Sequence, residues 1–418
     1  SRSCQSGWAG RNAMSSLAEL SPDTRQYLLV TGNYWAFTLT DGALRMLVVL
    51  HFHELGYTPF EIAMLFLFYE LFGVVTNLIG GWLGAHVGLN RLMHIGLGLQ
   101  VVALAMLLVP DYLLSVAWVM AAQALSGIAK DLNKMSAKSA VKLLVPGEAQ
   151  GQLYRWVAFL TGSKNALKGA GFFLGGLLLT LLDFNTAISV MAVVLLGIWI
   201  VAIFTLKRDF GKAKNKPAFT ELFSKSARIN ALSAARLCLF GARDVWFVVA
   251  LPVYLASVFG WDHWTVGGFL ALWIVGYGII QGFAPSITKQ DHGVPDGRAA
   301  FHWALLLAGI PLGIGFFLYF TPVVLLGGLL LFGVVFAVNS SLHSYLIVHY
   351  ADADGVSMDV GFYYMANAMG RLIGTVLSGY IYQTHGLATC LFVSSTLVTA
   401  AAAFSLLLPV SSDKVRDG

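Results

Sequence analysis

Cysteine and charged residues are scarce in this chain of 418 residues. The three cysteines, Cys4, Cys238 and Cys390, lie far apart without a CxxC pair, which argues against a disulfide framework and a thiolate metal site. Charged residues make up 11% of the chain, whereas soluble domains carry about 25%. This argues against a water-soluble fold, and the sparse net charge of +5 argues against nucleic-acid binding.

Long apolar runs dominate instead, because 57% of the residues are hydrophobic. A helix needs about 20 mostly apolar residues to cross about 30 Å of hydrocarbon. Twelve segments meet this requirement and predict an all-α membrane protein with spans at 27–52, 59–83, 92–110, 112–137, 153–182, 186–206, 231–257, 264–287, 300–320, 323–349, 358–383 and 388–409.

A polar stretch in the middle divides these spans into two groups of six. The predicted organisation is an N-terminal extension, a six-helix half, a linker, a second six-helix half and a C-terminal tail, at 1–26, 27–206, 207–230, 231–409 and 410–418. Lys and Arg outside the spans gather in the even-numbered loops and the two termini. The positive-inside rule therefore predicts that both termini are cytoplasmic.

The two halves share a short internal similarity. A shift of 203 positions (371 minus 168) aligns Lys168 with Arg371, and Gly171 with Gly374. Two related halves with a cation at one equivalent depth indicate a transporter whose site lies between the repeats, near the middle of the membrane.

We assign nine of the 26 Lys and Arg residues to the apolar segments and only four acids with them, Asp41, Glu70, Asp131 and Asp244. A cation in hydrocarbon costs about 2.5–3.5 kcal/mol on insertion scales, so such residues line water, a partner or a ligand. The surplus of cations predicts an anion-binding site. The candidates for substrate contact are Arg45, Lys130, Lys134, Lys164, Lys168, Arg236, Arg243 and Arg371.

The acids within the spans leave two interpretations open. Asp41, Glu70 and Asp244 are either proton-coupling groups or partners in structural ion pairs, and Asp41 is spaced to pair with Arg45 four residues later. The ninth cation, Lys138, belongs with Lys142 to a stripe at the inner end of its helix, where solvation or contact with lipid headgroups is the expected role.

Catalytic machinery is not evident in the sequence. A membrane-embedded enzyme acting on anionic lipids would need a nucleophile with a base, or a metal cluster, and no such spacing and no GxSxG motif occurs. We therefore predict a transporter that has no catalytic residue, metal or cofactor and works as a monomer on a small anionic substrate.

Two resemblances sharpen this prediction. Twelve helices in two halves with a basic linker resemble the major facilitator superfamily, and the segment 81–91 (GWLGAHVGLNR) resembles its G-x-x-x-D-R-x-G-x-x-R gating motif. Ala85 and His86 depart from that motif, at the positions of its Asp and first Arg. The usual acidic latch is therefore missing from this loop.

Four longer strings resemble the ArsJ organoarsenical efflux permeases: DGALRMLVVLHF (41–52), SGIAKDLNKMSAKSA (126–140), LTGSKNALKGAGFFLGG (160–176) and SAARLCLFGARDVWFVVALPVYL (233–255). The resemblance implies export of 1-arseno-3-phosphoglycerate across a bacterial inner membrane. It also implies a functional link to a glyceraldehyde-3-phosphate dehydrogenase that makes this ester. An exchanger or importer of phosphate esters or other organic anions is the alternative.

Overall fold

The computed structural model describes residues 21–57, 65, 67–145, 150–206, 211–223, 225–261, 263–288 and 294–410. The predicted tails lie mostly outside these residues. Regular structure in the described part is entirely helical, which confirms the predicted all-α class. The first group of helices is α2 (Pro22–Glu54), α4 (Leu67–Val87), α5 (Leu89–Met106), α6 (Val116–Leu144), α7 (Gln150–Leu181) and α8 (Phe184–Thr205).

A short 3-10 helix, η2 (Phe219–Phe223), lies in the linker, and another, η1 (Asp111–Leu113), precedes α6. The second group of helices is α9 (Ala227–Phe247), α10 (Ala250–Ser257), α11 (His263–Ile287), α12 (Gly297–Phe317), α13 (Pro322–Tyr350) and α14 (Val356–Ser405). Counting α9 with α10 as one span and α14 as two, these helices correspond to the twelve predicted spans.

Two of the predicted spans differ in detail from the observed helices. The seventh span is interrupted after Phe247, and the amide of Ala250, at the start of α10, donates a hydrogen bond to the Ser378 hydroxyl. The last two spans run together in α14 and are separated only by Gly386, whose φ of 79° lies in the left-handed region that glycine adopts without strain. A single residue therefore makes this turn.

Seven helical stretches are long and apolar enough to cross a membrane by length and composition alone. Helices α6 and α7 are not among them, although each is longer than a bilayer requires. The lysines that these two helices carry lower their hydropathy, so a simple hydropathy criterion misses two of the helices that carry candidate site residues.

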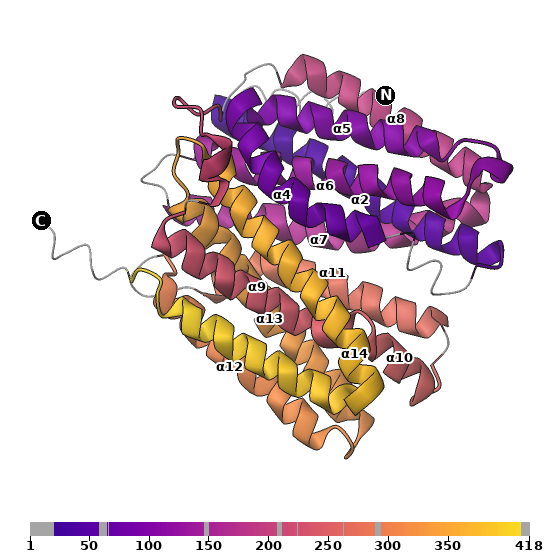
Figure 1. Ribbon diagram of the computed structural model, residues 1–418, viewed down its shortest axis with the longest axis vertical. Coiled ribbons are helices and arrows are strands. Elements are labelled where there is room, and N and C mark those ends of the chain that lie inside the picture. Colours follow the sequence, from indigo (N-terminus) through magenta and orange to yellow (C-terminus); the bar gives the residue numbers. More distant parts are fainter. Residues whose placement is uncertain are drawn as a thin grey trace, which may run out of the picture.

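The helices form two packed groups in Figure 1, with the indigo to magenta helices on one side and the red to yellow helices on the other. Two large apolar clusters fill them, and the second is built entirely from residues of α9 to α14. Across the boundary, α4 packs against α14 and α7 against α11. These contacts bring side chains of helices that are distant in the sequence into one central region.

Candidate anion-binding site

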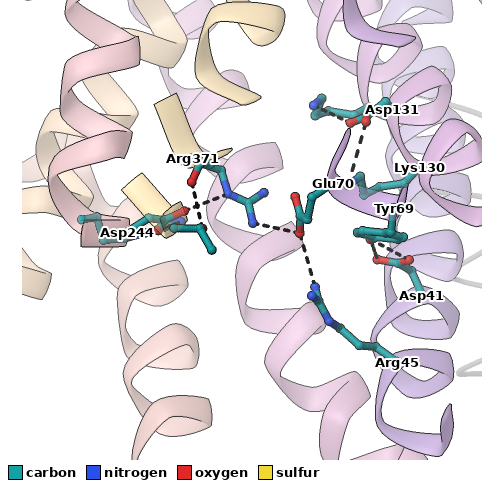
Figure 2. A network of polar contacts seen from close by, with 11 residues as sticks. Asp41, Arg45, Tyr69, Glu70, Lys130, Asp131, Asp244 and Arg371 are labelled. Carbon is teal, nitrogen blue, oxygen red and sulfur yellow. Dashed lines mark hydrogen bonds and ion pairs between the residues drawn. The ribbon is translucent and has the colours of Figure 1, made fainter. Parts of the chain in front are cut away.

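Glu70 joins the two groups of helices at the centre of the molecule. Its Oε1 accepts a hydrogen bond of 3.2 Å from Arg371 Nη2, and it lies 3.7 Å from Arg45 Nη1. Figure 2 shows Glu70 and Arg371 pointing toward each other from helices of different groups. One carboxylate thus serves two guanidinium groups, which come from α2 and α14.

Asp244 is shared in the same way within the second group. Its Oδ1 lies 2.6 Å from Arg243, and its Oδ2 accepts a hydrogen bond of 3.3 Å from Arg371 Nε. Arg371 therefore spans from Asp244 to Glu70 with two different nitrogens of its planar group, whereas a lysine offers a single nitrogen (Figure 2). The guanidinium of Arg243 also lies 4.9 Å from the centroid of the Phe240 ring.

A third acid, Asp131 on α6, neutralises the lysines beside it. Lys134 Nζ lies 2.7 Å from Asp131 Oδ1, and Lys130 Nζ lies 3.9 Å from Oδ2. Lys130 also sits over the ring of Tyr69, 3.8 Å from its centroid, while the Tyr69 hydroxyl donates to Asp41 with 2.9 Å to either carboxylate oxygen. Tyr69 thereby connects the acid on α2 with the basic face of α6.

Three side chains of this network are partly exposed. The exposed fractions are 28% for Arg45, 29% for Glu70 and 29% for Arg371. Glu70 and Arg371 face each other from different groups of helices, so these side chains lie at the boundary of the two groups. The arrangement can therefore receive a water-soluble ligand.

The cations outnumber the carboxylates that reach them. Lys164 contacts the side-chain oxygen of Asn165 at 3.2 Å, and Arg236 contacts Asn367 and Ser340. In the part of the chain that the structure describes, no carboxylate lies within ion-pair distance of Lys164, Lys168 or Arg236. Lys168 lies within electrostatic range of one acid, Asp41, and of three cations, Arg45, Arg371 and Lys130. The structure thus leaves a net positive charge around one central region.

The predicted site residues lie at two positions along the helix axes. We call the side chains linked through Glu70, Asp244 and Asp131 the central network. Seven of the eight cations and the predicted acids belong to this network or lie near it. Arg236 lies seven residues before Arg243 on α9, which places it about 10 Å along the helix axis. Their contact with a substrate stays a prediction.

The expectation for Lys138 is wrong. Solvation or contact with headgroups was expected, but the side chain is buried, with 2% exposed, and its Nζ has no hydrogen-bond partner among the described residues. The reason is that α6 packs against α13 and α14. Lys142, one turn later, is partly buried and donates a hydrogen bond to the backbone oxygen of His349 on α13.

Polar residues that carry no charge were missed as parts of this site. Tyr69 orients Asp41, Asn367 binds Arg236, and Asn165 donates to Gln281 across the two groups. Their only signal in the sequence is an amide or phenol within an apolar span, which packing between helices explains equally well. No group of three His, Cys, Asp or Glu residues is placed to hold a metal ion in the described ranges.

Solved structures with a similar fold are membrane transporters. The human organic anion transporter MFSD10 (TETRAN) superposes with a TM-score of 0.75 at 18% identity, covering 92% of this chain and 100% of that one. A bacterial homologue of the iron transporter ferroportin reaches 0.71 at 16% identity, covering 91% and 98%. The fucose:proton symporter FucP of E. coli reaches 0.70 at 12% identity, covering 91% and 97%.

No curated protein sequence matches the chain significantly. The family model of the Major Facilitator Superfamily matches residues 29–354, which is most of the chain and includes parts of both groups of helices. With the helical architecture and these structural neighbours, the match shows that the chain belongs to the Major Facilitator Superfamily and is a multi-pass membrane transporter.

Proposed function

We propose that this transporter exports an anionic organoarsenical, 1-arseno-3-phosphoglycerate, by alternating access, and thereby confers resistance to arsenate. The observation that carries the proposal is the surplus of cations between the two groups of helices. Arg45, Arg243 and Arg371 share two carboxylates, and Lys168 has none within ion-pair distance. A ligand with several negative charges would neutralise the remaining positive charge.

The chemistry of the side chains supports an oxyanion ligand. Guanidinium groups present two parallel N–H donors that match the oxygens of phosphate, arsenate and carboxylate. Trivalent arsenic is bound by thiolates instead, and the two described cysteines, Cys238 and Cys390, are buried on different helices of the second group. The site therefore favours a pentavalent arsenic ester over arsenite.

The choice of this ester among organic anions rests on the resemblance of four sequence strings to the ArsJ permeases. The cation cluster by itself fits other phosphate esters as well. The proposal includes a bacterial inner membrane, cytoplasmic termini and a glyceraldehyde-3-phosphate dehydrogenase that supplies the substrate. In this proposal Asp41 has a structural role, because its carboxylate is engaged by the Tyr69 hydroxyl.

The proposal is tested by arsenate resistance in cells that lack their own arsenic exporters. We expect resistance only when the transporter and the dehydrogenase are expressed together, with arsenate released outside the cells. Resistance that is independent of the dehydrogenase would favour a different anion carrier.

The variant Arg371→Lys locates the site in the same assay. We expect it to lose most of the resistance, because a single ammonium nitrogen replaces the two separate nitrogens that contact Asp244 and Glu70. The control is Arg298→Lys, a conservative change at an exposed position in the first turn of α12. Equal resistance in the two variants, at equal expression, would remove Arg371 from the proposed site.

A further inference from the structure

A second group of basic side chains lies one to two helical turns, about 6–10 Å, from the central network, toward the end of the molecule where the predicted cytoplasmic loops are. We call Lys138 on α6, Arg236 on α9 and His343 on α13 the inner cluster. Their exposed fractions are 2%, 3% and 0%, so all three are buried. They come from both groups of helices, and the cluster therefore sits on the boundary that opens and closes in alternating access.

The surroundings of Arg236 are polar and aromatic, and no acid of the described residues lies within ion-pair distance. Its Nε donates to Asn367 at 2.8 Å, and its Nη1 donates to the hydroxyl of Ser340 at 3.1 Å. Its guanidinium lies 3.9 Å from the centroid of the Phe240 ring and 5.2 Å from that of Tyr363. Neutral groups thus hold the side chain in place and leave its charge unbalanced.

Lys138 adds to this imbalance, and His343 adds buried polar atoms. Among the described residues, the Nζ of Lys138 and both ring nitrogens of His343 have no hydrogen-bond partner. The charged groups within electrostatic range of Lys138 are Arg236 and Lys134, and Arg236 is also the charged neighbour of His343. A buried charge without a partner carries an uncompensated desolvation cost. Such a residue within a membrane protein indicates a functional site.

Contacts beyond the cluster close it from the side of the predicted cytoplasmic loops. Lys142 donates to the backbone of His349 at 2.9 Å, and His349 Nδ1 lies 2.7 Å from the side-chain oxygen of Gln150. Tyr345 contacts the same oxygen at 3.4 Å. These contacts join α6 and α7 to α13, so the inner cluster becomes accessible only when the two groups of helices part at this end.

We propose that the inner cluster is a second anion-binding site, which takes one small tetrahedral oxyanion of the phosphate class when the predicted cytoplasmic end is open. Lys138 and Arg236 supply the charge, and His343 supplies a hydrogen bond. The site precedes the central network on the path of an outgoing anion. This inference rests on the uncompensated charge and not on the identity of the exported ester, so it stands or falls separately from arsenate resistance.

The test is calorimetric titration of inorganic phosphate into the full chain in lipid nanodiscs. We expect Lys138→Met to weaken phosphate binding at least about tenfold, as truncation of a buried charged contact does. The control is Lys216→Met, which removes the same charge at an exposed position of the linker and should change the affinity less than about twofold, because exposed lysines contribute little. Arg371→Gln removes a cation of the central network and so separates phosphate binding there from binding at the inner cluster.

A second measurement separates a binding role from a structural one. Without phosphate, Lys138→Met should raise the midpoint of thermal unfolding, because the variant no longer buries an unpaired ammonium group. A lowered midpoint would show that Lys138 stabilises the fold and would overturn the proposal. Phosphate binding that survives in Lys138→Met but is lost in Arg371→Gln would place the anion in the central network alone and would equally overturn it.

Discussion

At the scale of single residues, the Glu70 carboxylate occupies a position that a substrate anion could take. Its carboxylate occupies the space between Arg45 and Arg371 in which a substrate oxyanion would make similar contacts. The two guanidinium groups lie on different groups of helices. A substrate that displaces Glu70 would therefore take over its contacts with both guanidinium groups. The two groups of helices would stay linked through the site with or without the substrate.

We expect Glu70→Gln to bind 3-phosphoglycerate about fivefold more tightly than the unmodified chain, because losing a partly exposed ion pair of about 1 kcal/mol removes the internal competitor. Calorimetric titration of the purified chain measures the affinity. The control Glu54→Gln, exposed at the end of α2, should leave it unchanged. Weaker binding in Glu70→Gln would mean that the carboxylate positions the ligand and does not compete with it.

The residue pairs at the site were only partly predictable. Apolar runs interrupted by Lys and Arg identified the cations, and the distribution of apolar segments identified the helices that carry them. The ion-pair partners of these cations could not be predicted. Glu70 and Arg371 are 301 positions apart and meet only because α4 packs against α14. Asp41 shows the same limit, because spacing favoured Arg45 whereas the Tyr69 hydroxyl also engages it.

At the scale of helices, close backbone contact between α2 and α7 positions Lys168. A Cβ atom added at Gly171 would lie 2.7 Å from the backbone oxygen of Leu39 and 3.0 Å from the Cα of Gly42. No side chain fits there without moving one helix. The approach holds the lysine-bearing face of α7 beside Arg45, so packing and charge placement are coupled in this pair of helices.

We expect Gly171→Ala to lower the free energy of unfolding by about 1–3 kcal/mol, the usual cost of overpacking. Gly176→Ala is the matched control on the same helix, because an added Cβ would meet only Leu50, at 3.9 Å. The control should be neutral or slightly stabilising, since alanine favours helices. Thermal unfolding in detergent measures the two, and equal stability in both variants would contradict the close contact.

At the scale of the whole molecule, the two groups of helices are joined at the end where α7 begins and α11 ends. The hydroxyls of Tyr154 and Thr288 lie 3.0 Å apart, and the Ser357 hydroxyl donates to the backbone of Gly81 at 2.7 Å. At Gly162 an added Cβ would lie 2.5 Å from the backbone of Gly278 and Gly282. This end is closed in the described state.

A bulky residue at Gly162 should therefore shift the molecule toward the state in which this end is open. Spin labels on cysteines introduced at Arg155 and Ile287, in a chain without its native cysteines, report the separation of α7 and α11. We expect a longer distance for Gly162→Leu and an unchanged one for Gly151→Leu, because Gly151 lies on the same helix and has open space around it. Unchanged distances in both variants would contradict a close α7–α11 contact.

The charge of the proposed substrate also determines what drives its export. Each negative charge that moves outward across 100 mV, inside negative, gains about 2.3 kcal/mol, so a multiply charged ester leaves without coupling to protons. The structure supplies stationary cations to balance this charge in the middle of the membrane, and Glu70 is held between two of them. We therefore expect a uniporter or an anion exchanger.

Proteoliposomes loaded with 3-phosphoglycerate, a stable stand-in for the arsenate ester, test this expectation. With potassium and valinomycin setting an inside-negative potential and no pH gradient, efflux should accelerate as the potential grows and should persist when a protonophore is added under the same clamp. Empty liposomes and the Arg371→Lys protein control for leakage. Efflux that requires a pH gradient at fixed potential would show proton coupling instead, and Asp41 or Glu70 would then be the carboxylates to examine as its carrier.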